Sequence, residues 1–192
     1  MKKILIINGH PDKESYNYAL ADAYINGAKK AGAEVRQINI ADLKFNPNLA
    51  YGYRKRTNHE PDLVDSLEKI KEADHLVWVF PMWWYGYPAL MKGFIDRVFL
   101  PGLTFDYVKG SPFPKGLLKN KTARIIITSD TPYWYNKLFM GNPTINQFKK
   151  GTLKFCGIKP VKVTYIATIK NSKDRFRAKW LQKVTDLGKN LK

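Results

Sequence analysis

Apolar and polar positions along the chain predict repeated strand–helix units. Short apolar runs are typical of strands that a parallel sheet buries on both faces. They occur at residues 4–7, 75–80 and 123–128; residues 34–40 alternate apolar and polar positions loosely and predict a further strand, and residues 161–169 predict the fifth. Each is followed by apolar residues at helical spacing, so five strands alternate with five helices.

The predicted helices are marked by apolar residues three or four positions apart. We expect Gly32 to end the first helix and Ser172 to cap the last. The first helix is marked by Leu20, Tyr24 and Ala31, and the second by Leu63, Leu67 and Ile70. The third and fourth span residues 88–99 and about 144–155. The last is marked by Phe176, Trp180, Val184, Leu187 and Leu191.

This alternation predicts a doubly wound α/β fold in a single domain, residues 1–192. We expect a five-stranded parallel sheet in the order 2-1-3-4-5 with helices on both faces. Residues 100–120 are rich in glycine and proline and predict an excursion such as a hairpin. Residues 133–143 predict an aromatic loop. The connection 42–60 is unusually long, which is often a sign of function.

The loops after strands one, three and four should meet, because strands one and three flank the switch point of this order. The first loop, residues 9–17, runs into a helix whose N-terminus offers free N–H groups to a phosphate. Ser15 and Asn17 add side-chain donors, and His10 can add a third. Simple capping of the helix by Ser15 or Asn17 is the alternative reading of this loop.

The second loop places three consecutive aromatics, Trp83, Trp84 and Tyr85, between Pro81 and Gly86. Such side chains can stack on a flat ring, and backbone amides nearby can bond ring nitrogens and oxygens. Burial in the core or anchoring at the surface is the alternative use of these aromatics.

The third loop, residues 128–135, supplies hydroxyls from Ser129 and Thr131 and an aromatic cover from Tyr133, Trp134 and Tyr135. Each loop by itself fits ordinary turn chemistry. Their joint placement at three neighbouring strand ends predicts a flavin site.

Charge divides the chain unevenly. Residues 1–108 carry a net charge of +1 and residues 109–192 carry +16 of the total +17. A cationic half can attract nucleic acid, an anionic membrane or an anionic cofactor such as NADPH. No zinc spacing, aromatic RNA-binding motif or arginine-rich arm accompanies the lysines, so we expect no specific nucleic-acid binding.

Several features favour a cytoplasmic protein. No apolar run approaches the roughly 18 residues of a membrane span. Residues 4–7 are too short for the apolar part of a signal peptide. The lone cysteine, Cys156, suits a reducing compartment and a buried packing role. His59 and His75 lack metal-ligand spacing, so we expect no metal site, and we expect a structural role for His75.

Three stretches carry a resemblance to a known family: GHPDKESYN, VFPMWWYGYPALMKGFIDRVFLPGLTF and TSDTPYWY. They resemble the flavodoxin-like NAD(P)H:quinone oxidoreductases, which include DT-diaphorase, modulator-of-drug-activity reductases and the ancillary reductases of potassium efflux systems. The similarity runs along nearly the whole chain. Its most specific part is the proline–any–aromatic–aromatic motif before a G-x-P-A-x-x-K-G-x-x-D-R helix.

The resemblance implies ping-pong hydride transfer from NAD(P)H through flavin N5 to a quinone or a similar acceptor. It implies a homodimer whose partner chain completes the pocket. The family uses both FMN and FAD; we expect FMN, with FAD as the alternative, because no motif here marks contacts for an adenosine arm. By matching position the resemblance assigns flavin contacts to His10, Ser15, Tyr16 and Asn17, to Pro81, Met82, Trp83, Trp84 and Tyr85, and to Ser129, Asp130 and Thr131.

The chain also departs from the mammalian pattern. In the mammalian enzymes of this family, a tyrosine and a histidine after the third loop help to relay charge. Tyr135 is the counterpart of that tyrosine and our candidate catalytic residue. No histidine follows residue 75, so the relay histidine is absent. Alternative functions are an azo- or nitro-compound reductase and a regulatory flavin subunit of a potassium efflux system, associated peripherally with its membrane partner. A flavodoxin-type electron carrier is disfavoured because such carriers tend to be acidic.

Overall fold

The five predicted strands form one parallel sheet. In the computed structural model, which describes residues 1–190, the strands run in the order β2-β1-β3-β6-β7. Their bounds are Lys3–Asn8 for β1, Glu34–Asn39 for β2, His75–Pro81 for β3, Thr122–Thr128 for β6 and Val161–Ile166 for β7. The two short strands that interrupt the numbering lie outside this sheet, so the predicted order 2-1-3-4-5 is confirmed.

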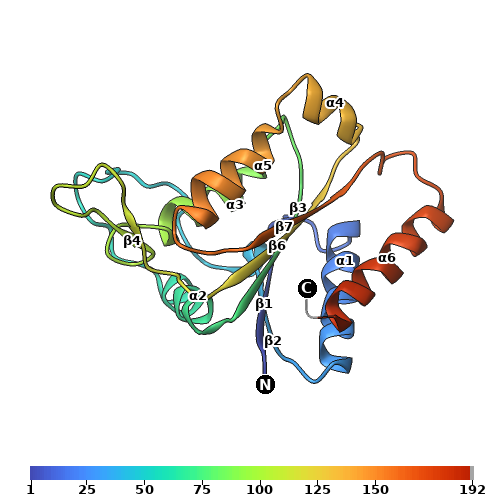
Figure 1. Ribbon diagram of the computed structural model, residues 1–192, viewed down its shortest axis with the longest axis horizontal. Coiled ribbons are helices and arrows are strands. Elements are labelled where there is room, and N and C mark those ends of the chain that lie inside the picture. The colour runs from blue at the N-terminus through green and yellow to red at the C-terminus, as the bar shows by residue number, and fades with distance from the viewer. Residues whose placement is uncertain (191–192) are drawn as a thin grey trace.

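Helices cover both faces of the sheet, as Figure 1 shows. On one face lie α1 (Tyr16–Lys30) and α6 (Asp174–Lys189). On the other lie α2 (Pro61–Glu72), α3 (Ala89–Val98) and α5 (Pro143–Phe148), which continues into the π-helical η2 (Lys149–Lys154). The short 3-10 helix η1 (Ile40–Asp42) follows β2.

The central strand β3 shows how the sequence divides between two cores. Its residues are all buried, and successive side chains point to opposite faces. Leu76, Trp78 and Phe80 join the core under α2, α3 and α5, while Val77 and Val79 join the core under α1 and α6. A strand buried on both faces explains why the run is apolar without alternation.

Two glycines let α1 and α6 approach closely. A Cβ on Gly27 would lie 2.0 Å from the carbonyl oxygen of Thr185, and one on Gly188 would lie 2.3 Å from that of Tyr24. No larger residue fits at such distances. The contact fixes α6 beside α1, and with it the start of α6 near the carboxyl ends of the strands.

Local predictions differ from the structure at three places. Residues 133–143 are not a continuous loop, because α4 (Tyr133–Leu138) forms after Pro132 and is anchored by the fully buried Asn136. The fifth strand ends at Ile166 rather than at residue 169, because the Ile169 N–H donates to the Ser129 carbonyl instead, at 3.3 Å.

The start of α6 is the third difference. Its N-cap is Lys173 and not Ser172, whose hydroxyl donates to the Ile169 carbonyl at 2.7 Å. Leu191, which we expected on the apolar face of this helix, lies outside the described residues. The predicted excursion at 100–120 contains the antiparallel pair β4 (Phe105–Asp106) and β5 (Lys115–Gly116).

Cys156 is buried as predicted, and burial raises the pKa of its thiol to about 11. The thiol therefore stays protonated and packs as a small apolar group. Among residues 1–190, no helix combines the length and apolar character needed to cross a bilayer.

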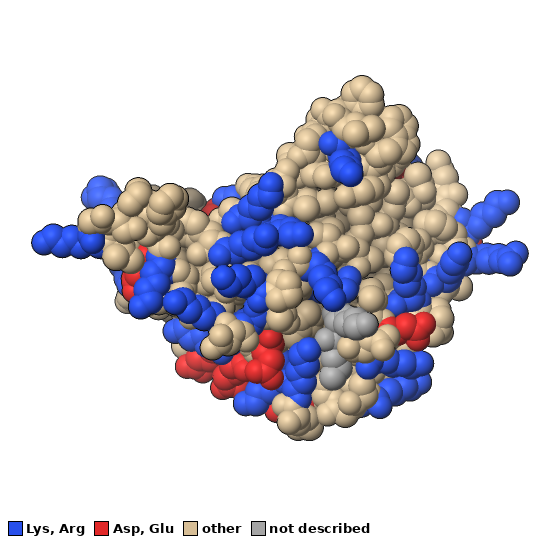
Figure 2. All heavy atoms as spheres, viewed as in Figure 1, with Lys and Arg blue, Asp and Glu red and all other residues tan. Residues whose placement is uncertain are grey.

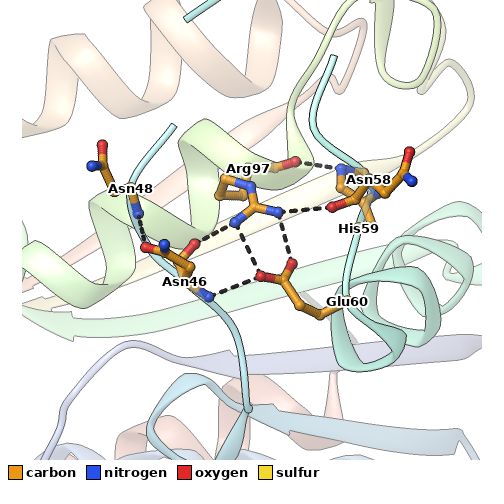
Figure 3. A network of polar contacts seen from close by, with 6 residues as sticks. All are labelled: Asn46, Asn48, Asn58, His59, Glu60 and Arg97. Carbon is orange, nitrogen blue, oxygen red and sulfur yellow. Dashed lines mark hydrogen bonds and ion pairs between the residues drawn. The ribbon is translucent and has the colours of Figure 1, made fainter. Parts of the chain in front are cut away.

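The long connection 43–60 is held to α3 by one buried guanidinium, as Figure 3 shows. Arg97 is 1% exposed and pairs with Glu60, with Nη2 2.7 Å from Oε2. It also donates to the carbonyls of Asn46 and Asn58, at opposite ends of the loop. His59 closes the network with Nε2 2.6 Å from the Arg97 carbonyl oxygen. A buried charge with these partners fixes where the loop begins and ends.

His75 makes the fold sensitive to acid. Its ring is buried with Nδ1 2.6 Å from Thr122 Oγ1, and burial, aided by nearby Lys2 and Arg124, lowers its pKa from 6.5 to about 4. The unfolded chain therefore binds more protons between these pH values. We expect the free energy of unfolding to fall by up to about 3 kcal/mol as the pH drops from 6.5 to 4.

Urea unfolding across this pH range measures the effect. A His75→Gln variant should lose this part of the pH dependence, so that its stability converges on that of the wild type toward pH 4. Parallel curves for the two proteins would show that His75 does not carry it.

Candidate functional site

Four loops meet at a cavity of about 210 Å³ at the carboxyl ends of the strands. Nine of the thirteen residues predicted from the sequence line it: His10, Ser15, Tyr16, Asn17, Pro81, Met82, Trp83, Ser129 and Asp130. Thr128, Ile169 and Lys170 complete the lining. The three loops predicted to meet therefore do so in the fold, and the loop after β7 joins them as a fourth.

The first and third loops are joined by a buried polar pair. The hydroxyl of Thr128 accepts from Asn17 Nδ2 at 3.1 Å and lies 3.2 Å from Asn17 Oδ1, to which it can donate. Both residues are 4% exposed. The pair satisfies polar groups that would otherwise be costly to bury, and it fixes the start of α1 against the end of β6.

Ser15 is the N-cap of α1, yet its side chain makes no capping hydrogen bond. Its Oγ is buried and has no partner within the described residues. The N–H groups of Tyr16 and Asn17 belong to the first turn, where no carbonyl of the helix can accept from them. The N-terminus of a fifteen-residue helix thus presents unused donors to the cavity, which favours an anion.

His10 and Tyr16 contribute differently to this wall. The Asp12 N–H donates to His10 Nδ1 at 3.0 Å, so the neutral ring carries its proton on Nε2. Burial lowers the pKa of His10, although Asp12 opposes this, and the ring packs edge-on against Trp83 at 5.5 Å. Tyr16 donates its hydroxyl to the Arg177 carbonyl at 2.7 Å, and burial raises its pKa to about 12. Tyr16 therefore offers its ring rather than its hydroxyl.

The second loop is a tight turn built from bulky residues. Trp83 and Gly86 exchange both backbone hydrogen bonds, at 3.1 and 2.9 Å. The two residues between them have positive φ, +50° for Trp84 and +55° for Tyr85, which is unusual for aromatic side chains. Thr144 Oγ1 holds the turn by donating to the Tyr85 carbonyl at 2.5 Å.

This turn separates the three aromatics that the sequence places together. Trp83 lines the cavity, whereas Trp84 and Tyr85 do not. Trp84 is fully exposed at 100%. The backbone conformation, which residue types alone do not reveal, decides which of them faces the site.

The third loop is ordered by its own hydrogen bonds. Ser129 Oγ accepts from the Thr131 N–H at 3.0 Å, and the Thr131 carbonyl accepts from the Tyr165 hydroxyl at 3.0 Å. Thr131 supports the loop without lining the cavity. Tyr135 lies on α4, where its ring stacks on Phe139 at 5.2 Å. It does not line the cavity, so its catalytic role stays a prediction.

The loop after β7 was missed by sequence reasoning. Its Lys170 N–H donates to Asp130 Oδ1 at 2.6 Å, which ties it to the third loop. Ile169 and Lys170 thereby close one side of the cavity. The signal was available, because strand five lies beside strand four in the order 2-1-3-4-5 and its following loop must reach the same edge.

Comparison with known proteins agrees with this architecture. A family model described as a flavodoxin-like fold matches residues 2–187. The NAD(P)H dehydrogenase [quinone] 1 of Cavia porcellus is 31% identical over 82% of this chain, and the match spans 65% of that enzyme's length. The resemblance predicted from the sequence is confirmed.

Solved structures extend the comparison to nearly the whole chain. Smu.1420 from Streptococcus mutans UA159 is 32% identical, with a TM-score of 0.84 over 98% of this chain and 99% of its own. An FMN-dependent NADH-azoreductase from Bacillus anthracis str. Ames Ancestor, solved in complex with FMN, is 20% identical with a TM-score of 0.77, covering 99% of both chains. The latter likeness is one of fold.

The left-handed backbone conformation of the exposed Trp84 should lower the stability of the protein. A Trp84→Asn variant removes no buried surface, and asparagine adopts positive φ more readily. We expect the free energy of unfolding to rise by about 1 kcal/mol. Trp134→Asn, at an exposed helical position, is the matched control and should bring no gain. A loss of stability in Trp84→Asn would show that the indole makes a stabilising contact.

Proposed function

The chain belongs to the flavodoxin-like family of NAD(P)H:quinone oxidoreductases, and from this premise we propose that it uses a bound flavin to pass two electrons from NAD(P)H to a quinone-like acceptor. The observation that carries the proposal is the unpartnered, buried Ser15 Oγ at the start of α1, in the same cavity as Trp83 and Ser129. An anion site beside an aromatic wall and a polar loop fits a phosphate joined to a flat ring.

The residues divide between the two ends of such a ligand. Ser15, the first-turn N–H groups of α1 and His10 Nε2 would donate to the phosphate. Asn17 is committed to Thr128, so it supports this wall from behind rather than touching the phosphate with its side chain.

At the other end, Pro81, Met82 and Trp83 would face the ring from the second loop, with Ser129 and Asp130 from the third. The Met82 N–H is already used, since it donates to the Thr128 carbonyl at 2.8 Å. This bond fixes the spacing of the two loops. When bound, the flavin supplies the hydride-carrying chemistry, so the protein's task is to bind, orient and exclude water.

We propose FMN rather than FAD. One phosphate accounts for the donors at α1, and a protein of the same fold is solved in complex with FMN. We further propose that the protein works in the cytoplasm as a homodimer. An azo compound is the second candidate acceptor, because that FMN-containing protein of the same fold is an azoreductase.

Removal of the Ser15 hydroxyl tests the phosphate end. We expect Ser15→Ala to weaken FMN binding by about tenfold to a hundredfold, because one hydrogen bond to a charged group is lost. Ser111→Ala is the control, since Ser111 is exposed in the 100–120 excursion and its hydroxyl bonds Phe113 there, away from the cavity. Flavin fluorescence titration measures both. Equal affinities for the two variants would place the phosphate elsewhere.

The activity itself is tested by following NAD(P)H oxidation with a water-soluble benzoquinone and with an azo dye. We expect turnover that depends on bound flavin, and release of FMN on denaturation of the purified protein. A colourless protein that binds neither FMN nor FAD would refute the proposed function. Released FAD would correct the cofactor alone.

A further inference from the structure

The turn of the second loop needs a contact from outside it. Trp84 and Tyr85 both have positive φ, a pattern that two-residue turns usually build from asparagine and glycine. Bulky side chains crowd the backbone in this conformation, so the turn is not favoured by its own sequence. A group elsewhere in the fold must therefore stabilise it.

The Thr144 hydroxyl supplies this contact. Thr144 is fully buried, and its Oγ1 donates to the Tyr85 carbonyl at 2.5 Å. Figure 1 shows the start of α5 beside the loop that follows β3. Without the hydroxyl, the Tyr85 carbonyl would lose this partner, and the turn could relax toward negative φ.

Thr144 is itself placed by α4. It is the second residue of α5, which begins after the left-handed N-cap Asn142. The Asn142 N–H donates to the Asn136 carbonyl at 2.9 Å, and Asn136 Nδ2 donates to Asn142 Oδ1 at 3.1 Å. Asn136 is fully buried, and α4 follows the third loop directly at Pro132. These contacts link the end of the third loop to the turn of the second.

The linkage is made by neutral groups. Within residues 1–190, no ion pair involves α4 or α5. Figure 2 shows few charged side chains on the surface around α4. Salt screens interactions between charges, so the stabilisation of the turn should be the same at low and at high ionic strength.

The turn determines one wall of the cavity. Trp83 opens the turn, lines the cavity and meets His10 edge-on at 5.5 Å. The Met82 N–H before it is fixed to Thr128, so the direction of Trp83 depends on the turn that follows. We propose that Thr144 is a positioning residue whose hydroxyl keeps Trp83 at the cavity and thereby shapes the end that receives the flavin ring. The part about the ring rests on the proposed function, whereas the part about the turn does not.

Hydrogen exchange in the full chain tests the turn and needs no flavin. The N–H groups of Trp83 and Gly86 close the turn, and they should exchange about tenfold faster in Thr144→Val, which keeps the shape of threonine but lacks the hydroxyl. Thr144→Ser keeps the hydroxyl and should exchange as the wild type does. The difference should persist at high salt.

Ser66→Ala is the matched control. Ser66 is also fully buried, and its Oγ donates to the Asp62 carbonyl in α2, away from the cavity. This variant loses a buried hydroxyl of the same kind and should leave the exchange of Trp83 and Gly86 unchanged.

A turn with favourable residues gives a second test. Trp84→Asn/Tyr85→Gly introduces the pair that this turn prefers, so the turn no longer needs the hydroxyl. Added to Thr144→Val, it should return the exchange of Gly86 to within about twofold of the wild type. This rescue separates loss of the turn from damage to α5.

Flavin titration tests the effect on the cavity. Thr144→Val should weaken the binding of FMN and of riboflavin by the same factor, about threefold to tenfold, because both carry the ring. Ser15→Ala should weaken FMN alone, because riboflavin lacks the phosphate. Thr144→Ser should bind both as the wild type does. A wild-type protein that binds neither would refute the proposed function, and hydrogen exchange would still decide the role of Thr144.

Four results would overturn the proposal. Unchanged exchange at Trp83 and Gly86 in Thr144→Val would show that the hydroxyl does not stabilise the turn. An equal acceleration in Ser66→Ala would assign the effect to a general loss of stability. An equal acceleration in Thr144→Ser would assign it to the threonine methyl group. Faster exchange in Thr144→Val with unchanged affinity for both flavins would refute the part that concerns the ring.

Discussion

The buried hydrogen bonds between Asn17 and Thr128 determine where the site can form. One hydroxyl serves both ends of an amide, so the start of α1 cannot shift relative to β6 without leaving polar groups unpaired in the core. The adjacent Met82 N–H bonds the Thr128 carbonyl and brings the second loop to the same point. The end of one strand thereby sets the distance between the anion site of the first loop and the aromatic wall of the second.

The fold was predictable because its inner strands, β1, β3 and β6, are buried on both faces. Runs such as 75–80 and 123–128 have no polar alternation, which is typical of a parallel sheet and leaves few topologies to consider. Prediction was wrong where the same side chain or segment could form either of two local arrangements and its hydrogen bonds decide between them. Ser172 could cap a helix, but its hydroxyl bonds the carbonyl of Ile169 instead. Residues 133–143 look like a loop because their aromatics show no buried helical face, and only Asn136 anchors α4.

The site was predictable by loop but less so by residue. Strand order alone brings Ser15, Trp83 and Ser129 together. It cannot tell that Trp84 and Tyr85 turn away, since this follows from two positive φ angles held by Thr144, sixty positions along the chain from Trp84. Residue type also misled for Tyr16 and Asn17, whose polar atoms are used by Arg177 and Thr128 rather than facing the cavity. Donor types in a loop therefore indicate a site, while the hydrogen bonds decide which donors are free.

The distinction between groups used within the fold and groups left free also applies to the charged residues. Carboxylates of the first half are used in the fold, most clearly where Glu60 neutralises the buried Arg97. Within residues 1–190, the eight lysines of 131–173 form no ion pair with a carboxylate, so their mutual repulsion is uncompensated there. Trp84 and the α4 aromatics likewise expose surface that the fold would gain from burying. Exposed apolar side chains and uncompensated charges that the fold does not need are best understood as parts of interactions with other molecules. Of these features, Lys170 lines the cavity and Trp84 directly follows Trp83, which also lines it.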